Sequence, residues 1–231
     1  MSSRPAAAMA SMSEPDILDP RTSALVIVDV QNDFCHPDGA AAKMGLDISA
    51  VQEAVPKIME LIGSARDADV PRIYLRGEHS HWFNTDAWLR RGTKGNSINA
   101  PKVPIVEAGS WGADFFEVDP QPDELVVTKH RYSGFAYTPL ELALQTLHTT
   151  NVVLCGTATN VCVEATARDA IMRGYFPVVI ADCVAGGHAD LHATALKDMA
   201  EYLGAVVSLE DVRAAWGSAK RAESMRIGGR V

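Results

Sequence analysis

The chain has 231 residues, of which 47% are hydrophobic and 22% charged, and its formal net charge is −8. This length and balance fit one globular α/β domain with a full hydrophobic core. The negative charge argues against a nucleic-acid or anionic-membrane partner, and no apolar run reaches the roughly 18 residues that a membrane span needs.

Four cysteines, Cys35, Cys155, Cys162 and Cys183, are spaced without any C-x-x-C pair, which argues against a structural zinc site. The first twenty residues are rich in Ala, Ser and Met and lack the continuous apolar centre of a secretory signal. We therefore expect reduced thiols and a cytoplasmic location.

Strand and helix patterns alternate along the chain. Continuous apolar runs, typical of strands buried on both faces, predict strands at 23–31, 71–77, 124–129, 151–156 and 176–183, with a sixth strand and a short helix within 205–216. Apolar residues at helical spacing predict helices at about 49–68, 138–148, 160–174 and 188–203. Ser49 is a candidate cap for the first helix, and Thr138 with Glu141 forms a candidate capping box for the second.

This alternation predicts a three-layer Rossmann-like sandwich: a six-stranded, mostly parallel sheet with helices on both faces. We expect a flexible N-terminal segment at 1–20, a single domain at 21–216 and a polar C-terminal tail at 217–231. The irregular stretch 78–120 is long for a loop in a compact domain, and such loops are usually functional.

Three reactive side chains follow or end predicted strands. Asp29 ends the first strand, Lys129 ends the third, and Cys162 follows the fourth where a helix begins. Because ligands of such sheets bind at the carboxyl ends of the strands, we expect the three to share one rim. Each residue alone also has an ordinary interpretation: a turn aspartate, a solvated lysine or a buried cysteine.

An acid, an amine and a thiol on one rim suit nucleophilic catalysis. A positive charge on Lys129 and the N-terminal end of the helix would favour the thiolate of Cys162. Asp29 would accept the thiol proton and return it to a leaving amine. The small residues before Cys162 would let the N–H groups of Ala158 and Cys162 point at a developing oxyanion.

Three segments resemble the motif blocks of the isochorismatase-like cysteine hydrolase superfamily: "ALVIVDVQNDF", "VVTKHRYSGFAYTPLELAL" and "LCGTATNVCVEATARDAIMRGYFPVVIADC". The resemblance covers about residues 23–210. That superfamily includes nicotinamidases, N-carbamoylsarcosine amidases, biuret hydrolases and ureidoacrylate amidohydrolases. The "RYSGF" block followed by "TPL", with "ATNVCVE", is most similar to the ureidoacrylate amidohydrolases.

The resemblance implies that Asp29 is the base, Lys129 orients and stabilises, and Cys162 is the nucleophile, with Ala158 and Cys162 supplying the oxyanion N–H groups. It also implies a cis peptide at Thr157–Ala158 and a homo-oligomer, either a dimer or a tetramer. The implied reaction is hydrolysis of a C–N bond in a small linear amide or ureide, of the ureidoacrylate, carbamoyl or biuret type. A thioester intermediate would form, ammonia or an amine would leave, and no cofactor would be required.

Four side chains are candidates for contacting the substrate. Phe34 follows the first motif and Tyr132 follows the second, while Trp82 and Arg90 lie in the long stretch after the second strand. An arginine there would bind a carboxylate in bidentate fashion. The alternative is that the aromatic residues only pack.

Glu78, His79 and His81 lie where nicotinamidases carry metal ligands, but the Asp-x-His pattern is missing, so we expect no metal ion. This departure weakens a nicotinamidase-like activity as an alternative. Isochorismatase-type vinyl-ether hydrolysis is a second alternative, and the nucleophilic cysteine argues against it. A non-enzymatic binding protein on the same fold is a third.

Overall fold

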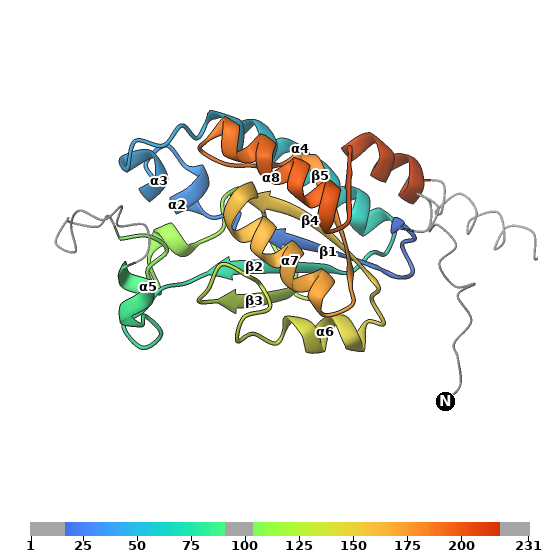
Figure 1. Cartoon of the computed structure of the whole chain (residues 1–231), viewed down its shortest axis with the longest axis horizontal. Helices are drawn as coiled ribbons and strands as arrows, with labels where there is room; N and C mark the ends of the chain where they lie inside the picture. Colours follow the sequence, from blue (N-terminus) through green and yellow to red (C-terminus); the bar gives the residue numbers. More distant parts are fainter. Residues whose placement is uncertain (1–16, 91–103, 218–231) are drawn as a thin grey trace, which may run out of the picture.

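The computed structural model describes residues 17–90 and 104–217, and its centre is a six-stranded sheet (Figure 1). The strand order is β3-β2-β1-β4-β5-β6, and every pairing is parallel. The strands are β1 (Ser23–Val28), β2 (Arg72–Gly77), β3 (Leu125–Lys129), β4 (Asn151–Thr157), β5 (Phe176–Ala185) and β6 (Ala205–Val207). The predicted sheet is therefore confirmed.

Helices cover both faces of this sheet (Figure 1). They are α2 (Asn32–Cys35), α3 (Ala40–Lys43), α4 (Ser49–Asp67), α5 (Asp86–Arg90), α6 (Leu140–Thr146), α7 (Glu164–Met172) and α8 (Ala189–Tyr202), with helical residues at 209–217. One core cluster joins the sheet to α4 and the helical residues 209–217, and the other joins it to α6, α7 and α8. This arrangement is the predicted three-layer sandwich.

The first and fourth strands, β1 and β4, are neighbours at the centre of the sheet. Every residue of β1 and β4 is buried, as expected for central parallel strands covered on both faces. The chain winds outward from β1 through β2 to β3, and then from β4 through β5 to β6. The carboxyl ends of β1 and β4 therefore lie at the point where the winding direction switches, which is where ligands bind in such folds.

The helix starts differ from the sequence predictions. Ser49 is the first residue of α4 and not its cap: Ile48 occupies the N-cap position, and the Ser49 backbone N–H donates to the carboxylate of Asp47 at 2.9 Å. The helix α6 begins at Leu140, whose N–H donates to the Thr138 hydroxyl at 3.2 Å. Glu141 instead pairs with Arg173 at 3.2 Å, because this long-range partner competes with the local capping box.

Two other elements also differ in extent. The strand β5 continues to Ala185, two residues beyond the predicted end, after a register shift opposite Leu154 and Gly156. The stretch 78–120 contains the short helix α5 and a 3₁₀ turn at Trp111–Ala113. The predicted terminal segments fall largely outside the described residues, and their boundaries stay predictions. No helix among the described residues has the length and apolar character to cross a membrane.

A buried ion-pair cluster fixes the start of β3. The Glu124 carboxylate, whose side chain is 1% exposed, accepts from Arg66 Nε and from Arg72 Nε, both at 2.8 Å. Burial alone would raise the pKa of Glu124, but hydrogen bonds from the two guanidinium groups hold that pKa well below its usual range. The cluster therefore ties α4 and β2 to the segment that leads into Lys129.

We expect Glu124→Gln to destabilise the fold at neutral pH by about 3 kcal/mol, because it leaves Arg66 and Arg72 without their buried anion. Since the folded-state pKa of Glu124 is depressed, its stabilisation is present above the pKa of an unfolded glutamate and is lost as pH falls through the folded value. The gap between wild type and variant in urea unfolding should therefore narrow in acid. An equal gap at neutral and acidic pH would contradict this account.

Candidate active site

The structure brings Asp29, Lys129 and Cys162 together at the carboxyl ends of β1, β3 and β4. Lys129 Nζ lies 2.8 Å from Asp29 Oδ2 and 3.4 Å from Cys162 Sγ. Asp29 and Lys129 side chains are 1% and 3% exposed. Residues separated by about a hundred positions in sequence thus meet in one buried site, as the sheet topology predicts.

The Lys129 ammonium is the centre of this constellation. It also donates to the backbone carbonyl of Arg131 at 3.0 Å, so its three hydrogens face a carboxylate, a sulfur and a carbonyl. Burial opposes the charge, but Asp29 and Cys162 together raise the pKa of Lys129 above its usual value. The amine is therefore a cation at neutral pH.

Cys162 differs from the other cysteines in its access to solvent. It is 8% exposed, whereas Cys35, Cys155 and Cys183 are each 0% exposed. Burial and the negative charge of Asp29 raise the pKa of the Cys162 thiol, and Lys129 offsets this only in part. Lys129 thus favours the thiolate, as predicted from the sequence, but burial and the charge of Asp29 act in the opposite direction and favour the thiol.

The segment carrying Cys162 is a tight turn between β4 and α7. It begins with a cis peptide at Thr157–Ala158, as the resemblance implied, and continues as a π-helical turn over Thr159–Val163, not as the first turn of an α-helix. We call Ala158–Val163 the nucleophile turn. Ala158 starts it and Cys162 lies within it, so their backbone N–H groups belong to one turn, and their oxyanion role stays a prediction.

Gly156 permits this turn to approach β1. Its φ of 115° lies in the region that favours glycine, and a Cβ at this position would collide with the carbonyl oxygen of Val28. Val28 is the last residue of β1 and directly precedes Asp29. The two strand ends are therefore in backbone contact where the acid and the nucleophile turn begin.

A single buried hydroxyl connects two of the sequence motifs. Thr166 Oγ1 donates to the backbone carbonyl of Cys162 at 2.7 Å and accepts the backbone N–H of Gly134 at 3.0 Å. Gly134 belongs to the "RYSGF" block that follows Lys129. The Thr166 contact therefore fixes the loop after β3 against the nucleophile turn.

Gln31 is a positioning residue that the sequence analysis missed. Its buried amide donates to the carbonyls of Gly77 at 2.9 Å and Ala113 at 2.7 Å, and its Oε1 accepts the N–H of Gly77 at 2.8 Å. This clamps the end of β2 beside Asp29. A polar amide two residues beyond Asp29, directly after the apolar strand run, was the available signal.

The predicted substrate-binding residues separate into two groups. Phe34 is half-buried and packs on the core, and Tyr132 is 39% exposed with its ring 4.7 Å from that of Trp88. Trp82 is 80% exposed with its ring against His81, and Arg90 pairs with Asp86 within α5 at 3.8 Å. Tyr132 follows Lys129 by three residues in the chain, and the substrate-binding role of all four residues stays a prediction.

Arg131 is a second residue that the sequence analysis missed. Its carbonyl accepts from Lys129, and its guanidinium lies over Trp88 at 5.0 Å and donates to the carbonyl of Phe83 at 3.1 Å. The Phe83 ring in turn stacks on His130 at 3.9 Å. Arg131 therefore joins the stretch after β2 to the residues around Lys129.

The candidate metal ligands have other contacts. His79 Nδ1 accepts from Trp88 Nε1 at 3.3 Å, and the His81 ring lies 4.6 Å from that of Trp82. Within 17–90 and 104–217, no group of three or more His, Cys, Asp or Glu side chains is arranged to hold a metal ion. The sequence-based expectation of a metal-free site stays a prediction.

Comparison with known proteins identifies the family to which this chain belongs. The isochorismatase domain model matches residues 23–211, and the chain belongs to the isochorismatase family. Ureidoacrylate amidohydrolase RutB of Methylobacterium radiotolerans is 34% identical over 227 residues, covering 90% of this chain and 85% of that protein.

Solved structures agree with this assignment. A cysteine hydrolase from Pseudomonas syringae pv. phaseolicola is similar with a TM-score of 0.74 and 28% identity, covering 87% of this chain and 94% of that one. N-carbamoylsarcosine amidase from Thermoplasma acidophilum has a TM-score of 0.66 and 25% identity, covering 81% and 96%. The resemblance read from the three motif blocks is thus confirmed.

We expect Asp29→Asn to lower the pH at which alkylation of Cys162 by iodoacetamide reaches half of its maximal rate. Removing the carboxylate charge lowers the thiol pKa and so raises the thiolate fraction. Peptide mapping by mass spectrometry after timed labelling at a series of pH values would measure this midpoint, with the fully buried Cys183 as the internal reference. An unchanged or higher midpoint in the variant would contradict the electrostatic role assigned to Asp29.

Proposed function

We propose that this protein is a cysteine-dependent amidohydrolase that cleaves a C–N bond of a small linear amide or ureide. The single observation that carries the proposal is the contact of Lys129 Nζ with both Asp29 and Cys162 in one buried site. Membership of the isochorismatase family and the amidohydrolases among its relatives support the same reaction class.

The proposed reaction begins with a coupled proton transfer. Because burial and the charge of Asp29 favour the thiol, Asp29 takes the proton as Cys162 Sγ forms a bond to the substrate carbonyl carbon. The negative charge moves to the carbonyl oxygen, where the N–H groups of Ala158 and Cys162 would stabilise it. Asp29 then returns the proton to the leaving nitrogen as the C–N bond breaks, which leaves a thioester.

Water completes the cycle. Asp29 accepts a proton from the attacking water, the C–S bond breaks, and the proton passes to the Cys162 sulfur. Lys129 stays charged throughout and balances whichever of its two partners carries the negative charge. This role explains why an amine is buried between an acid and a thiol.

Within this class, we propose a ureide of the ureidoacrylate type, which carries a carboxylate at the end opposite the carbamoyl group. Arg131 supplies a guanidinium next to the site, and among the described residues its hydrogen bonds go to backbone carbonyls, with no carboxylate paired to it. Tyr132 adds a partly exposed ring on the same loop. Similarity to RutB proteins supports this choice.

We expect Cys162→Ser to lower ammonia release from ureides and linear amides by at least about 10³-fold, because the nucleophile is lost. Cys183→Ala is the matched control, since that cysteine lies in β5, outside the trio. Unchanged turnover in Cys162→Ser would refute the proposed chemistry. Parallel assays with isochorismate would test the vinyl-ether alternative.

We expect Arg131→Gln to raise KM for a carboxylate-bearing ureide by about 10- to 100-fold, as for loss of a charge-assisted pair, and to leave a neutral carbamoyl substrate within about threefold. Arg131→Lys keeps the charge but not the planar fork, so it should lie between the two. Equal losses on both substrates would show that Arg131 only supports the loop.

A further inference from the structure

The first residue of the π-helical turn that carries Cys162 is held by a side chain outside the three motif blocks. Thr159 is completely buried, and its hydroxyl lies 2.8 Å from Nδ1 of His192, which comes from the helix α8. Within the described part of the chain, the Thr159 hydroxyl makes no other side-chain hydrogen bond.

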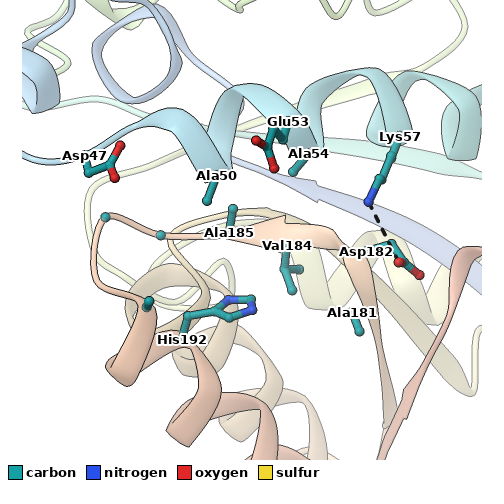
Figure 2. A pocket seen from close by; sticks show the side chains of 13 residues that line it. Asp47, Ala50, Glu53, Ala54, Lys57, Ala181, Asp182, Val184, Ala185 and His192 are labelled. Carbon is teal, nitrogen blue, oxygen red and sulfur yellow. Dashed lines mark ion pairs between the residues drawn. The ribbon is translucent and has the colours of Figure 1, made fainter.

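His192 reaches Thr159 from the wall of a cavity of about 310 Å³ (Figure 2). The cavity lies between α4, the carboxyl end of β5 and the start of α8, and the imidazole projects into this region below Val184. Charged residues line it as well: Asp47 just before α4, Glu53 and Lys57 of α4, and Asp182 of β5. None of Asp29, Lys129 and Cys162 lines it, so His192 approaches the nucleophile turn from outside the trio.

We propose that His192 is a positioning residue that holds the nucleophile turn, and hence Cys162, through its hydrogen bond to Thr159. The turn is short, so a displacement of Thr159 is transmitted to Cys162 three residues later. At its other end the turn is fixed by Thr166, which binds the carbonyl of Cys162. His192 and Thr166 therefore hold the nucleophile turn from opposite ends.

Replacing His192 leaves the buried Thr159 hydroxyl without this hydrogen bond, and replacing Thr159 leaves the half-buried His192 ring without it. A buried polar group without a partner is costly, so the turn would shift to find one. Burial lowers the pKa of His192, so the ring is neutral at neutral pH and its Nδ1 serves as donor or acceptor according to tautomer. The contact thus depends on the position of Nδ1, not on a charge.

A double-mutant cycle tests this directly. Thr159→Val removes the hydroxyl while keeping the side-chain shape, and His192→Ala removes its partner. Two readouts are measured on the full-length chain: the rate of Cys162 alkylation by iodoacetamide, and kcat and KM for ammonia release. Because alkylation needs no substrate, it reports on the turn even if the proposed function is wrong, and this part of the proposal does not rest on that function.

We expect each single variant to change the alkylation rate and to lower kcat by roughly tenfold with KM little changed, since misplacing a reacting group affects chemistry more than binding. The double variant should be no worse than the more affected single one. His192→Asn, whose amide nitrogen can occupy the position of Nδ1, should restore most of both. Thr194→Val is the matched control, because that exposed threonine of α8 hydrogen-bonds only within its own helix, to the carbonyl of Asp190.

Three results would overturn the proposal. One is wild-type alkylation and kcat in Thr159→Val and His192→Ala. Another is effects that multiply in the double variant, which would show that the residues act independently. The third is loss in Thr194→Val equal to that in His192→Ala, which would reveal general damage to α8. If His192→Ala does not fold, Thr159→Ser and His192→Asn, which keep the hydrogen bond, must still match the wild type.

Discussion

The ion pair between Lys129 and Asp29, buried against the sulfur of Cys162, is the interaction on which the site depends. Two charges without solvent are stable only with close geometry and further hydrogen bonds. Besides its ion pair with Asp29, the lysine donates hydrogen bonds to the Arg131 carbonyl and the Cys162 sulfur, while the buried Asp29 carboxylate has no further hydrogen bond within the described residues. Burial and the charge of Asp29 also raise the thiol pKa, so the reaction we propose couples nucleophilic attack to the transfer of a proton to Asp29.

Most residues around the trio act by fixing strand ends and loops. Gln31 clamps the end of β2, Thr166 joins the loop after β3 to the nucleophile turn, and Glu124 binds the two arginines at the opposite end of β3. These contacts are long-range in sequence and mostly buried. They explain how a parallel sheet holds three side chains from separate strands to the precision that covalent catalysis demands.

The sequence was sufficient for the sheet, the helical layers and the meeting of Asp29, Lys129 and Cys162 at one place. Continuous apolar runs predict buried parallel strands, and the parallel topology brings Asp29, Lys129 and Cys162 to one rim. Boundaries such as the end of β5 and the π-helical start before α7 could not be predicted, because they depend on register and on the packing of other elements.

The raised pKa of the Cys162 thiol also could not be predicted from the sequence. The sequence pattern predicts that Lys129 and a helix start lie near Cys162. Only the fold shows how deeply the Cys162 thiol is buried and how strongly Asp29 acts on its pKa. Arg131 and His192 were missed for a related reason: their contacts with Trp88 and Thr159 cross many positions in the chain. Assembly into a dimer or tetramer, and a cytoplasmic location, stay predictions.

The close approach of Gly156 to the carbonyl of Val28 limits the distance between the ends of β1 and β4. Since these residues lie just before the nucleophile turn and Asp29, the spacing of two main chains sets how far the sulfur stands from the acid. A methyl group at Gly156 would push the two strands apart and increase the distance between Cys162 and Asp29, over which the proton is transferred. The lack of a side chain at Gly156 is therefore what lets the nucleophile turn and Asp29 begin so close together.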